Sequence, residues 1–253
     1  HSYQAAGLKN LYAAEKKHFW FISRRERILA TVSKHVLSGS YILEVGAGTG
    51  YVAKGIQEIG YKVAVGEIHL SGLRYAKENG ISECYQLDLF DPPFQNKFDA
   101  IGMFDVLEHF EDDKHALRQV STMLKPGGKL FITVPAHQWL WNRDDFIAAH
   151  KRRYSKKKLI QTLEQAGMQI IELRFFFIAI LPILCLRHFL NRDSKEKVTE
   201  LELKKGIYIN PVINYLLLGL ARFENYFSKW LPNIVGGSLL CVAEKKTDTE
   251  HES

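Results

Sequence analysis

The sequence Tyr41-Ile-Leu-Glu-Val-Gly-Ala-Gly-Thr-Gly50 joins an apolar run to three alternating glycines. The apolar run predicts a buried strand, and the glycines allow positive φ angles and a close approach of a ligand to the main chain. Residues 51–59 have a helical composition and are followed by Gly60. A strand, a glycine turn and a helix N-terminus in this order predict a nucleotide-binding crevice, because backbone N–H groups and the helix dipole face the ligand there.

The glycine spacing indicates the kind of nucleotide. A dinucleotide fingerprint, G-x-G-x-x-G, would require glycine in place of Tyr51, whereas the third glycine falls at Gly50. Glu44 places an acid beside the turn, which repels phosphates and favours a ligand with a cationic amino group. The pattern Glu44-x-Gly46-x-Gly48-x-Gly50 resembles the first motif of class I S-adenosylmethionine-dependent methyltransferases.

Further motifs of this family follow in the family's order. Residues 61–67 predict a second strand that ends in Glu67, at about the distance where a carboxylate accepts both ribose hydroxyls. Residues 84–89 look like the third strand, whose terminal acid and next residue meet the adenine in this family. Phe98–Phe104 and the following Asp105-Val-Leu-Glu-His109 are similar to the family's fourth strand and its motif.

A turn and a fifth strand complete the resemblance. Leu124-Lys-Pro-Gly-Gly128 predicts a turn before an apolar strand at residues 129–134, and this turn is another mark of the family. The resemblance covers about residues 37 to 175. It implies an α/β fold with a Rossmann-like doubly wound sheet of about seven strands, the last of them antiparallel, with an N-terminal helical cap and a C-terminal helical insertion. The implied cofactor is S-adenosyl-L-methionine, with S-adenosyl-L-homocysteine as its product.

The N-terminal segment carries a second resemblance. His18-Phe-Trp-Phe21, followed by Arg24, is similar to the opening of a bacterial and archaeal subgroup of the family, many of whose members sit near genes for surface glycans and lipids. Trp20 and Arg24 are then expected to close over the methionine end of the cofactor. The alternative is an amphipathic helix that packs its aromatic residues on the core. The predicted cofactor-binding residues are Trp20, Arg24, Glu44, Gly46, Gly48, Gly50, Glu67, Ile68, Asp88, Leu89, Phe104, Asp105 and His109.

Composition indicates one domain with elaborations. A chain of 253 residues that is 46% hydrophobic and 25% charged can bury a sizeable core. The expected parts are a helical cap at 1–36, a core at 37–174 and 234–247, an apolar helical insertion or lid at 175–233, and a disordered tail at 248–253. The 3 cysteines lack metal-like or disulfide-like spacing and no export signal is visible, so we expect a cytoplasmic protein.

The segment after the fifth strand is strongly basic. In the same subgroup an Asp…His-x-Arg-Arg-Tyr pattern follows this strand, and the chain keeps it as Asp144 or Asp145, His150, Arg152, Arg153 and Tyr154. One interpretation is a solvated basic face. The other is an anion site, in which Arg152 and Arg153 grip a phosphate and the lysines at 156–158 attract an anionic head group or membrane.

Catalytic groups are expected to be few. Methyl transfer from a sulfonium needs an acceptor held in line with the methyl carbon in a dry pocket. A hydroxyl acceptor also requires a base, for which His150 is the first candidate, with His137, Asp144 and Tyr154 as alternatives. A carbon or carboxylate acceptor would not need that base.

The insertion contains two apolar segments and, between them, a charged linker at Asn191–Lys205. The first segment, Phe175–Leu186, is too short to span a bilayer, which takes about 20 residues. The second, Pro211–Trp230, carries an apolar stripe at helical spacing. The stripe is Val212, Leu216, Leu220, Phe223 and Phe227, and the opposite face holds Asn214, Arg222, Asn225 and Lys229. The segments either pack on the core or at a homodimer interface, or they bind a membrane surface together with the basic segment at 151–158.

Two classes of site are not expected. The acids and histidines between Glu108 and His115 favour a solvated helix start with acids near its N-terminus, and no metal is predicted. The formal net charge of +6 attracts anionic surfaces without separating lipid from nucleic acid. No stacking-aromatic RNA motif is evident, so nucleic acid is not expected as a partner.

Taken together, the sequence predicts an S-adenosylmethionine-dependent methyltransferase that acts on a lipid-linked, glycolipid or other amphipathic acceptor, peripherally at the cytoplasmic membrane face. The first alternative is a cytosolic small-molecule or sugar methyltransferase whose insertion forms a dimer interface. An RNA methyltransferase and a non-catalytic membrane-interaction protein are the further alternatives. The identity of the acceptor is not predicted.

Overall fold

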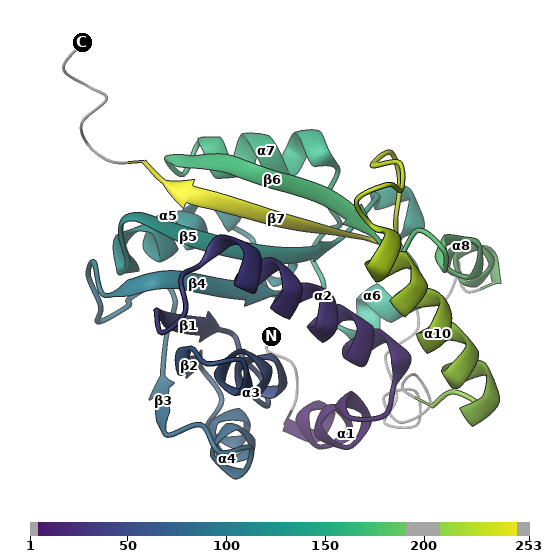
Figure 1. The fold of residues 1–253 in the computed structure, drawn as a ribbon, viewed down its shortest axis with the longest axis horizontal. Coiled ribbons are helices and arrows are strands. Elements are labelled where there is room, and N and C mark those ends of the chain that lie inside the picture. The colour runs from purple at the N-terminus through teal and green to yellow at the C-terminus, as the bar shows by residue number, and fades with distance from the viewer. Residues whose placement is uncertain (1–4, 191–207, 247–253) are drawn as a thin grey trace.

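The computed structural model describes residues 5–190 and 208–246, which form a central sheet with helices on both sides (Figure 1). The sheet has seven strands in the order β3-β2-β1-β4-β5-β7-β6. All neighbouring pairs are parallel except the two made by β7, which is antiparallel to β5 and to β6. The strands are β1 (Tyr41–Val45), β2 (Lys62–Glu67), β3 (Glu83–Gln86), β4 (Phe98–Phe104), β5 (Leu124–Pro135), β6 (Met168–Phe176) and β7 (Ser238–Lys245). This confirms the predicted sheet and its antiparallel last strand.

The core lies in two apolar layers, one on each face of the sheet, because alternate side chains of each strand point to opposite faces. In β1, Leu43 and Val45 belong to one buried cluster and Ile42 to the other. The first cluster is completed by α5 (Asp113–Met123) and α7 (Lys156–Glu164). The second is completed by α2 (Phe19–His35), α3 (Tyr51–Glu58), α4 (Leu70–Glu78) and α10 (Pro211–Phe227).

The order of the strands places a crevice at one edge of the sheet. Strand β1 pairs with β2 on one side and with β4 on the other, so the chain reverses its winding direction at β1. In parallel α/β sheets ligands bind outside the carboxyl ends of the strands at such a reversal. The loops after β1, β2 and β4 therefore form the expected site.

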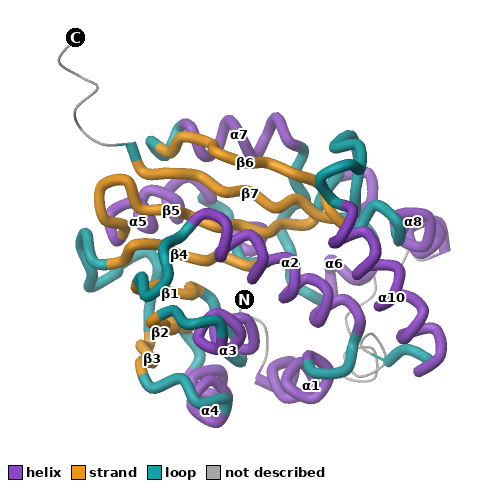
Figure 2. The backbone as a smooth tube through the Cα atoms, in the orientation of Figure 1, coloured by secondary structure: helices purple, strands orange, loops and turns teal. Residues whose placement is uncertain are grey.

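The structure describes five further helices. They are α1 (Ala5–Glu15), the short helices η1 (Leu107–His109) and η2 (Gln138–Leu140), α6 (Arg143–Ile147) and α8 (Leu181–Leu190). In the tube view, α2 runs across the sheet with α10 beside it, and α1 lies below the N-terminal end of α2 (Figure 2). No helix among residues 5–190 and 208–246 is long and apolar enough to cross a membrane.

The structure gives the bounds of the last strands and of the start of β5. Strand β6 continues to Phe176, so the insertion begins after the predicted position 175, and β7 begins at Ser238. The predicted turn at Leu124–Gly128 is instead the first part of β5, where Leu124 pairs with Phe98 and the register then shifts. Most of the charged linker at Asn191–Lys205 and the predicted tail at 248–253 lie outside the described residues.

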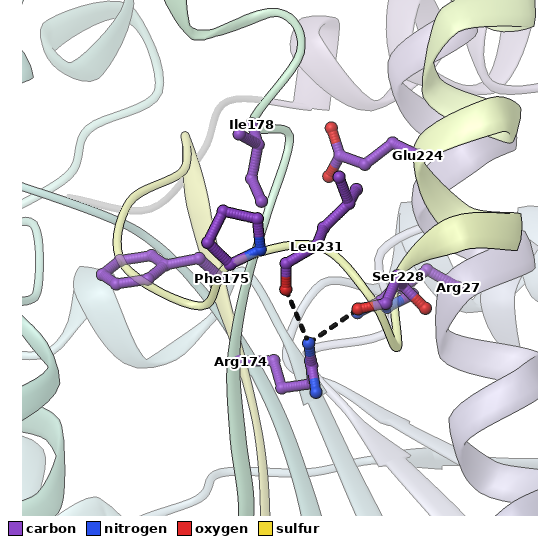
Figure 3. A pocket seen from close by; sticks show the side chains of 8 residues that line it. Arg27, Arg174, Phe175, Ile178, Glu224, Ser228 and Leu231 are labelled. Carbon is purple, nitrogen blue, oxygen red and sulfur yellow. Dashed lines mark hydrogen bonds between the residues drawn. The ribbon is translucent and has the colours of Figure 1, made fainter.

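The C-terminal end of α10 is anchored to β6. The Arg174 guanidinium donates to the backbone carbonyls of Ser228 at 2.6 Å and Leu231 at 3.3 Å (Figure 3). The pocket around these groups is also lined by Arg27 and Glu224. Because the pocket is filled by this anchoring arrangement and lies away from the carboxyl ends of β1 and β4, it serves packing and is not the candidate active site.

Candidate active site

The glycine turn after β1 has the backbone that its sequence predicts. Gly46, Gly48 and Gly50 have φ angles of +64°, +54° and +73°. Residues that carry a side chain rarely adopt this backbone conformation. A Cβ atom on Gly46 would lie 2.8 Å from the side chain of Val106, which follows β4. The turn thus brings bare backbone against the end of β4, directly before the first N–H groups of α3.

Two acids flank this turn. Glu44, at the end of β1, is buried and its Oε2 accepts a hydrogen bond from the Ala53 N–H at 2.6 Å. Burial raises the pKa of Glu44 to about 8. Glu67, at the end of β2, accepts hydrogen bonds from the N–H groups of Gly48 and His69, each at 2.9 Å. Both carboxyl groups are therefore positioned by β-strands that end at the crevice.

Arg24 enters the crevice from α2. Its guanidinium is ion-paired with Asp105, which has a φ of +57° and also accepts a hydrogen bond from the Thr133 hydroxyl at 2.9 Å. The buried Nε of Arg24 has no hydrogen-bond partner among the described residues. Burial lowers the pKa of Arg24, and the charge of Glu44 is the largest electrostatic effect that opposes this shift. A buried cation thus lies between the acids that follow β1 and β4.

Trp20 lies next to the crevice on the same helix. Its ring stacks on Phe177, just after β6, with a centroid distance of 4.1 Å. The structure therefore brings Arg24 to the glycine turn and uses Trp20 to join the cap to the insertion. The expectation that both residues cover the methionine end of the cofactor stays a prediction.

The other predicted cofactor residues follow the same edge of the sheet. Ile68 comes directly after β2 and its carbonyl accepts a hydrogen bond from Gln86, at the end of β3. Asp88 turns back to accept the Phe90 N–H at 2.9 Å, and Leu89 beside it is buried. Phe104 is the last residue of β4 and is buried. Their elements place all of them around the loops that follow β2, β3 and β4.

Glu15 is a crevice residue that the sequence did not reveal. It ends α1, is buried, and accepts a hydrogen bond from the Thr49 hydroxyl of the glycine turn at 2.5 Å. Burial raises its pKa to about 7. An acid before two lysines in a basic segment is the only signal that could have indicated it.

These groups fit a nucleoside that carries an amino acid. Glu44 suits a cationic amino group, the Arg24 guanidinium suits a carboxylate, and Glu67 suits ribose hydroxyls. The fit rests on the three positive-φ glycines, the contact that a Cβ atom on Gly46 would make, and the unpartnered nitrogen of Arg24.

The predicted base, His150, lies in a polar cluster at the end of β4. Its Nδ1 is 2.9 Å from Asp145 Oδ1, and its Nε2 is 3.7 Å from Glu108 Oε1. Asp145 is fixed by a capping box with Asn142 and by Arg153, whose Nε lies 2.8 Å from Oδ1. Although burial opposes it, the hydrogen bond from His150 and the charge of Arg153 hold the pKa of Asp145 below its usual value.

The alternative bases are placed differently. Tyr154 is fully buried, its hydroxyl donates to Asp113 at 2.9 Å, and burial raises its pKa, so it is not available as a base. Asp144 pairs with Arg187 at 2.7 Å. His137 has a φ of +60° and stacks on Phe175. His150 is thus the candidate that the structure brings next to η1.

The two arginines that were predicted to grip a phosphate are paired with acids of the protein in this structure. Arg152 donates to Asp113 at 3.1 Å and Arg153 to Asp145, so the predicted phosphate grip is occupied by the protein's own acids. The predicted solvated helix start is present at Glu111 and Asp112, which are exposed, and Asp112 is the N-cap of α5. Glu108, in contrast, is fully buried. His109 packs against His150 with a ring-centroid distance of 5.0 Å, and its predicted contact with the cofactor stays a prediction.

Known proteins share this architecture. A family model described as "Methyltransferase domain" matches residues 12–173, which is more than half of the chain. The ubiquinone biosynthesis O-methyltransferase of Xanthomonas oryzae pv. oryzae is 28% identical over 104 residues, 38% of this chain and 44% of that protein. The chain thus spans less than half of the length of this curated relative.

Two solved structures extend the comparison. A chain in the complex between the Haloferax volcanii Trm112 methyltransferase activator and a methyltransferase has a TM-score of 0.64 and 17% identity, covering 98% of this chain and 96% of that chain. The Haemonchus contortus phosphoethanolamine N-methyltransferase 2, in complex with S-adenosyl-L-methionine, has a TM-score of 0.56 and 17% identity, covering 88% of this chain and 53% of that chain. These likenesses show the fold. The family match over residues 12–173 shows that this chain belongs to the S-adenosylmethionine-dependent methyltransferases.

Proposed function

We propose that this protein transfers the methyl group of S-adenosylmethionine to an amphipathic acceptor, such as a lipid-linked or glycolipid molecule, at the cytoplasmic face of a membrane. The cofactor supplies an electrophilic methyl group. One observation carries the choice of acceptor: helix α10 packs on the protein through Leu217 and Ala221 together with polar side chains, and its predicted apolar stripe faces solvent.

The polar face of α10 contacts the cap helix α2. The Asn214 side chain accepts a hydrogen bond from the Phe19 N–H and donates to the Lys17 carbonyl, each at 2.8 Å. Asn225 donates to the Ser23 carbonyl at 3.0 Å. Polar side chains therefore hold α10 on the backbone of the cap, although the apolar stripe was one candidate for packing on the core.

The apolar face of α10 is exposed along the whole helix. Of the predicted stripe, Val212, Leu216 and Phe223 are 69%, 65% and 60% exposed. Tyr226 and Trp230, beside them, are 76% and 74% exposed. A soluble monomer rarely leaves such a continuous apolar surface in water. Tyrosine and tryptophan are the residues enriched at membrane–water interfaces, where a ring meets lipid and its polar atom meets head groups.

Basic and further apolar residues accompany this face. Helix α8 exposes Ile183, Leu186 and Phe189. At the start of α7, Lys156 donates to the Asn233 carbonyl at 2.6 Å, which places this lysine-rich turn beside the segment that follows α10. Its neighbours at 157 and 158 are exposed. Apolar burial combined with attraction to anionic lipid gives stable peripheral binding, and either signal alone gives less.

The proposed acceptor atom is a hydroxyl oxygen, and the relatives named O-methyltransferases support this choice. Asp145 orients His150 through Nδ1, so Nε2, which lies 3.7 Å from Glu108 Oε1, is the nitrogen proposed to take the proton. In the metal-free protein the hydroxyl proton passes to His150 and then to solvent. The acceptor oxygen bonds to the methyl carbon as the carbon–sulfur bond breaks, and a methyl ether and S-adenosylhomocysteine result.

Sedimentation with vesicles of phosphatidylglycerol and phosphatidylcholine tests the membrane part of the proposal. The wild-type protein is expected to sediment with them, and Leu216→Asp together with Phe223→Asp to abolish this without changing cofactor affinity. Leu37→Asp is the matched control, because Leu37 is 84% exposed but lies before β1. Equal sedimentation of all three proteins would contradict the proposal.

The oligomeric state distinguishes the proposed membrane surface from the main alternative, a dimer interface. If the double variant changed a wild-type dimer into a monomer and no protein bound vesicles, the exposed face would be a dimer interface, as a cytosolic small-molecule methyltransferase would use it. Binding to RNA with a steep salt dependence, and not to vesicles, would instead favour an RNA substrate.

A further inference from the structure

We propose that Glu108, His109 and His150 form a binding site for a divalent transition metal ion beside the cofactor crevice. The three residues come from η1, directly after β4, and from the segment after α6. Their donor atoms all lie within 4.8 Å of one another. The metal site itself follows from these contacts, and its catalytic role rests on the function proposed above.

Glu108 is the first reason to infer a ligand. Its side chain is fully buried, and neither carboxylate oxygen has a hydrogen-bond partner in the part of the chain that the structure describes. A buried carboxylate without partners is strongly unfavourable unless it takes up a proton or meets a cation. The nearby guanidinium groups of Arg24 and Arg153 are already ion-paired with Asp105 and Asp145.

The backbone brings the second histidine to this carboxylate. The Lys151 N–H donates to the Glu108 carbonyl at 2.8 Å, which fixes the neighbouring His150 next to η1. His150 Nε2 then lies 3.7 Å from Glu108 Oε1. Metal–ligand bonds of about 2.0–2.2 Å in a tetrahedral site place donor atoms about 3.4 Å apart. Small side-chain movements would therefore suffice to close the site.

Both imidazoles have the outer partners that metal-binding histidines use. Asp145 Oδ1 lies 2.9 Å from Nδ1 of His150, so Nε2 is the nitrogen directed at Glu108. His109 is hydrogen-bonded to the backbone of Ala149. Such partners fix the tautomer and the ring orientation of a histidine ligand. The capping box and the Arg153 ion pair in turn hold Asp145 in place.

The ligand types indicate the class of metal. Two imidazoles and one carboxylate suit Zn²⁺, Fe²⁺, Co²⁺ or Mn²⁺, whereas Mg²⁺ and Ca²⁺ prefer sites made of oxygen atoms. Three protein ligands leave a coordination position open, as in catalytic metal sites. A hydroxyl acceptor bound there would lose its proton more readily to solvent. In the metal-bound protein His150 is then a ligand, and it no longer acts as the base.

Metal titration tests the site without measuring activity. Protein free of an affinity tag is titrated with Zn²⁺ by calorimetry and with Co²⁺ by visible absorption. We expect one ion per chain, and affinity at least about tenfold weaker in Glu108→Gln, His109→Ala and His150→Ala, from the cost of losing ligands or their supports. The control is His115→Ala, because His115 lies on α5 outside the cluster.

A failure of the proposed metal site can be distinguished from a failure of the proposed function. Each protein is also titrated with S-adenosylmethionine, and circular dichroism reports whether the variants fold. Absence of stoichiometric Zn²⁺ and Co²⁺ binding by wild-type protein that binds S-adenosylmethionine would overturn the metal site and leave the proposed function intact. Unchanged metal affinity in all three folded variants would also overturn it. The wild-type titration remains decisive if a variant does not fold.

Discussion

At the scale of single residues, the crevice is defined by buried charges. Glu15, Glu44 and Arg24 meet there from α1, β1 and α2, and burial raises the pKa of both carboxyl groups. Burying this many ionisable groups is unfavourable for folding alone, because each loses its hydration. Such clusters of perturbed groups mark binding sites. A dipolar ligand would satisfy both signs of charge at once.

Glu44 should make stability depend on pH. Its pKa rises from 4.5 unfolded to about 8 folded, so its contribution is fully present below about 4.5 and is lost as the pH rises to about 8. Glu44→Gln removes this dependence. Urea denaturation at several pH values should therefore show the variant gaining stability relative to wild type from pH 5 to pH 8.

Titration of the histidines does not affect the comparison between wild type and Glu44→Gln. Burial lowers the pKa of His18 and His109 to about 4, which costs stability as the pH falls below about 6.5, but both proteins share this effect. A constant difference between wild type and Glu44→Gln across pH 5–8 would show that Glu44 is ionised in the folded protein.

At the scale of elements, local patterns were predictable and the side on which a helix packs was not. The strand β1, its glycine turn and α3 follow from residues that are adjacent in sequence. The stripe at Val212–Phe227 predicted helix α10, since periodicity is a local property. The outward orientation of its apolar stripe depends on backbone groups of Phe19 and Ser23, which lie 195 and 202 residues away from their partners in the sequence, and no local pattern contains them.

Because the apolar stripe of α10 faces solvent, mutating a polar residue of α10 that contacts the cap should cost more stability than mutating a residue of the stripe. Asn214→Ala removes two hydrogen bonds to the cap and should lower the free energy of unfolding by about 1–3 kcal/mol. Leu216→Ala on the exposed face should change it by no more than about 0.5 kcal/mol. Denaturant unfolding of both variants measures this. A larger loss for Leu216→Ala would mean that the apolar face is the packed one.

At the scale of the whole molecule, the sequence predicted the sheet, because the family's motifs occur in order along the chain, and the candidate cofactor residues follow its strands at one edge. The cluster around Asp145 was not predictable in the same way. The sequence assigned Glu108, Arg153 and His150 separately, to a solvated helix start, an anion site and a catalytic base. Only the meeting of η1 with the segment after α6 shows that Asp145 pairs with His150 and Arg153 and that Glu108 lies 3.7 Å from His150.

The arrangement also joins the parts of the proposed function. Helix α2 contributes Arg24 to the crevice and carries α10 on its other side through Asn214 and Asn225. The face proposed to meet lipid is therefore one helix away from the crevice. An acceptor held at the bilayer surface would need to move little to reach it.

Calorimetric titration with S-adenosylmethionine, S-adenosylhomocysteine and NAD tests the central claim most directly. Micromolar binding of the first two ligands and none of NAD is expected. Glu67→Ala should weaken binding about 10- to 100-fold, since hydrogen bonds to a charged group contribute about 1.5–3 kcal/mol. Glu58→Ala, an exposed acid paired with Arg25, should leave it unchanged. Failure to bind either adenosyl ligand, or equal affinity in Glu67→Ala, would contradict this account of the crevice.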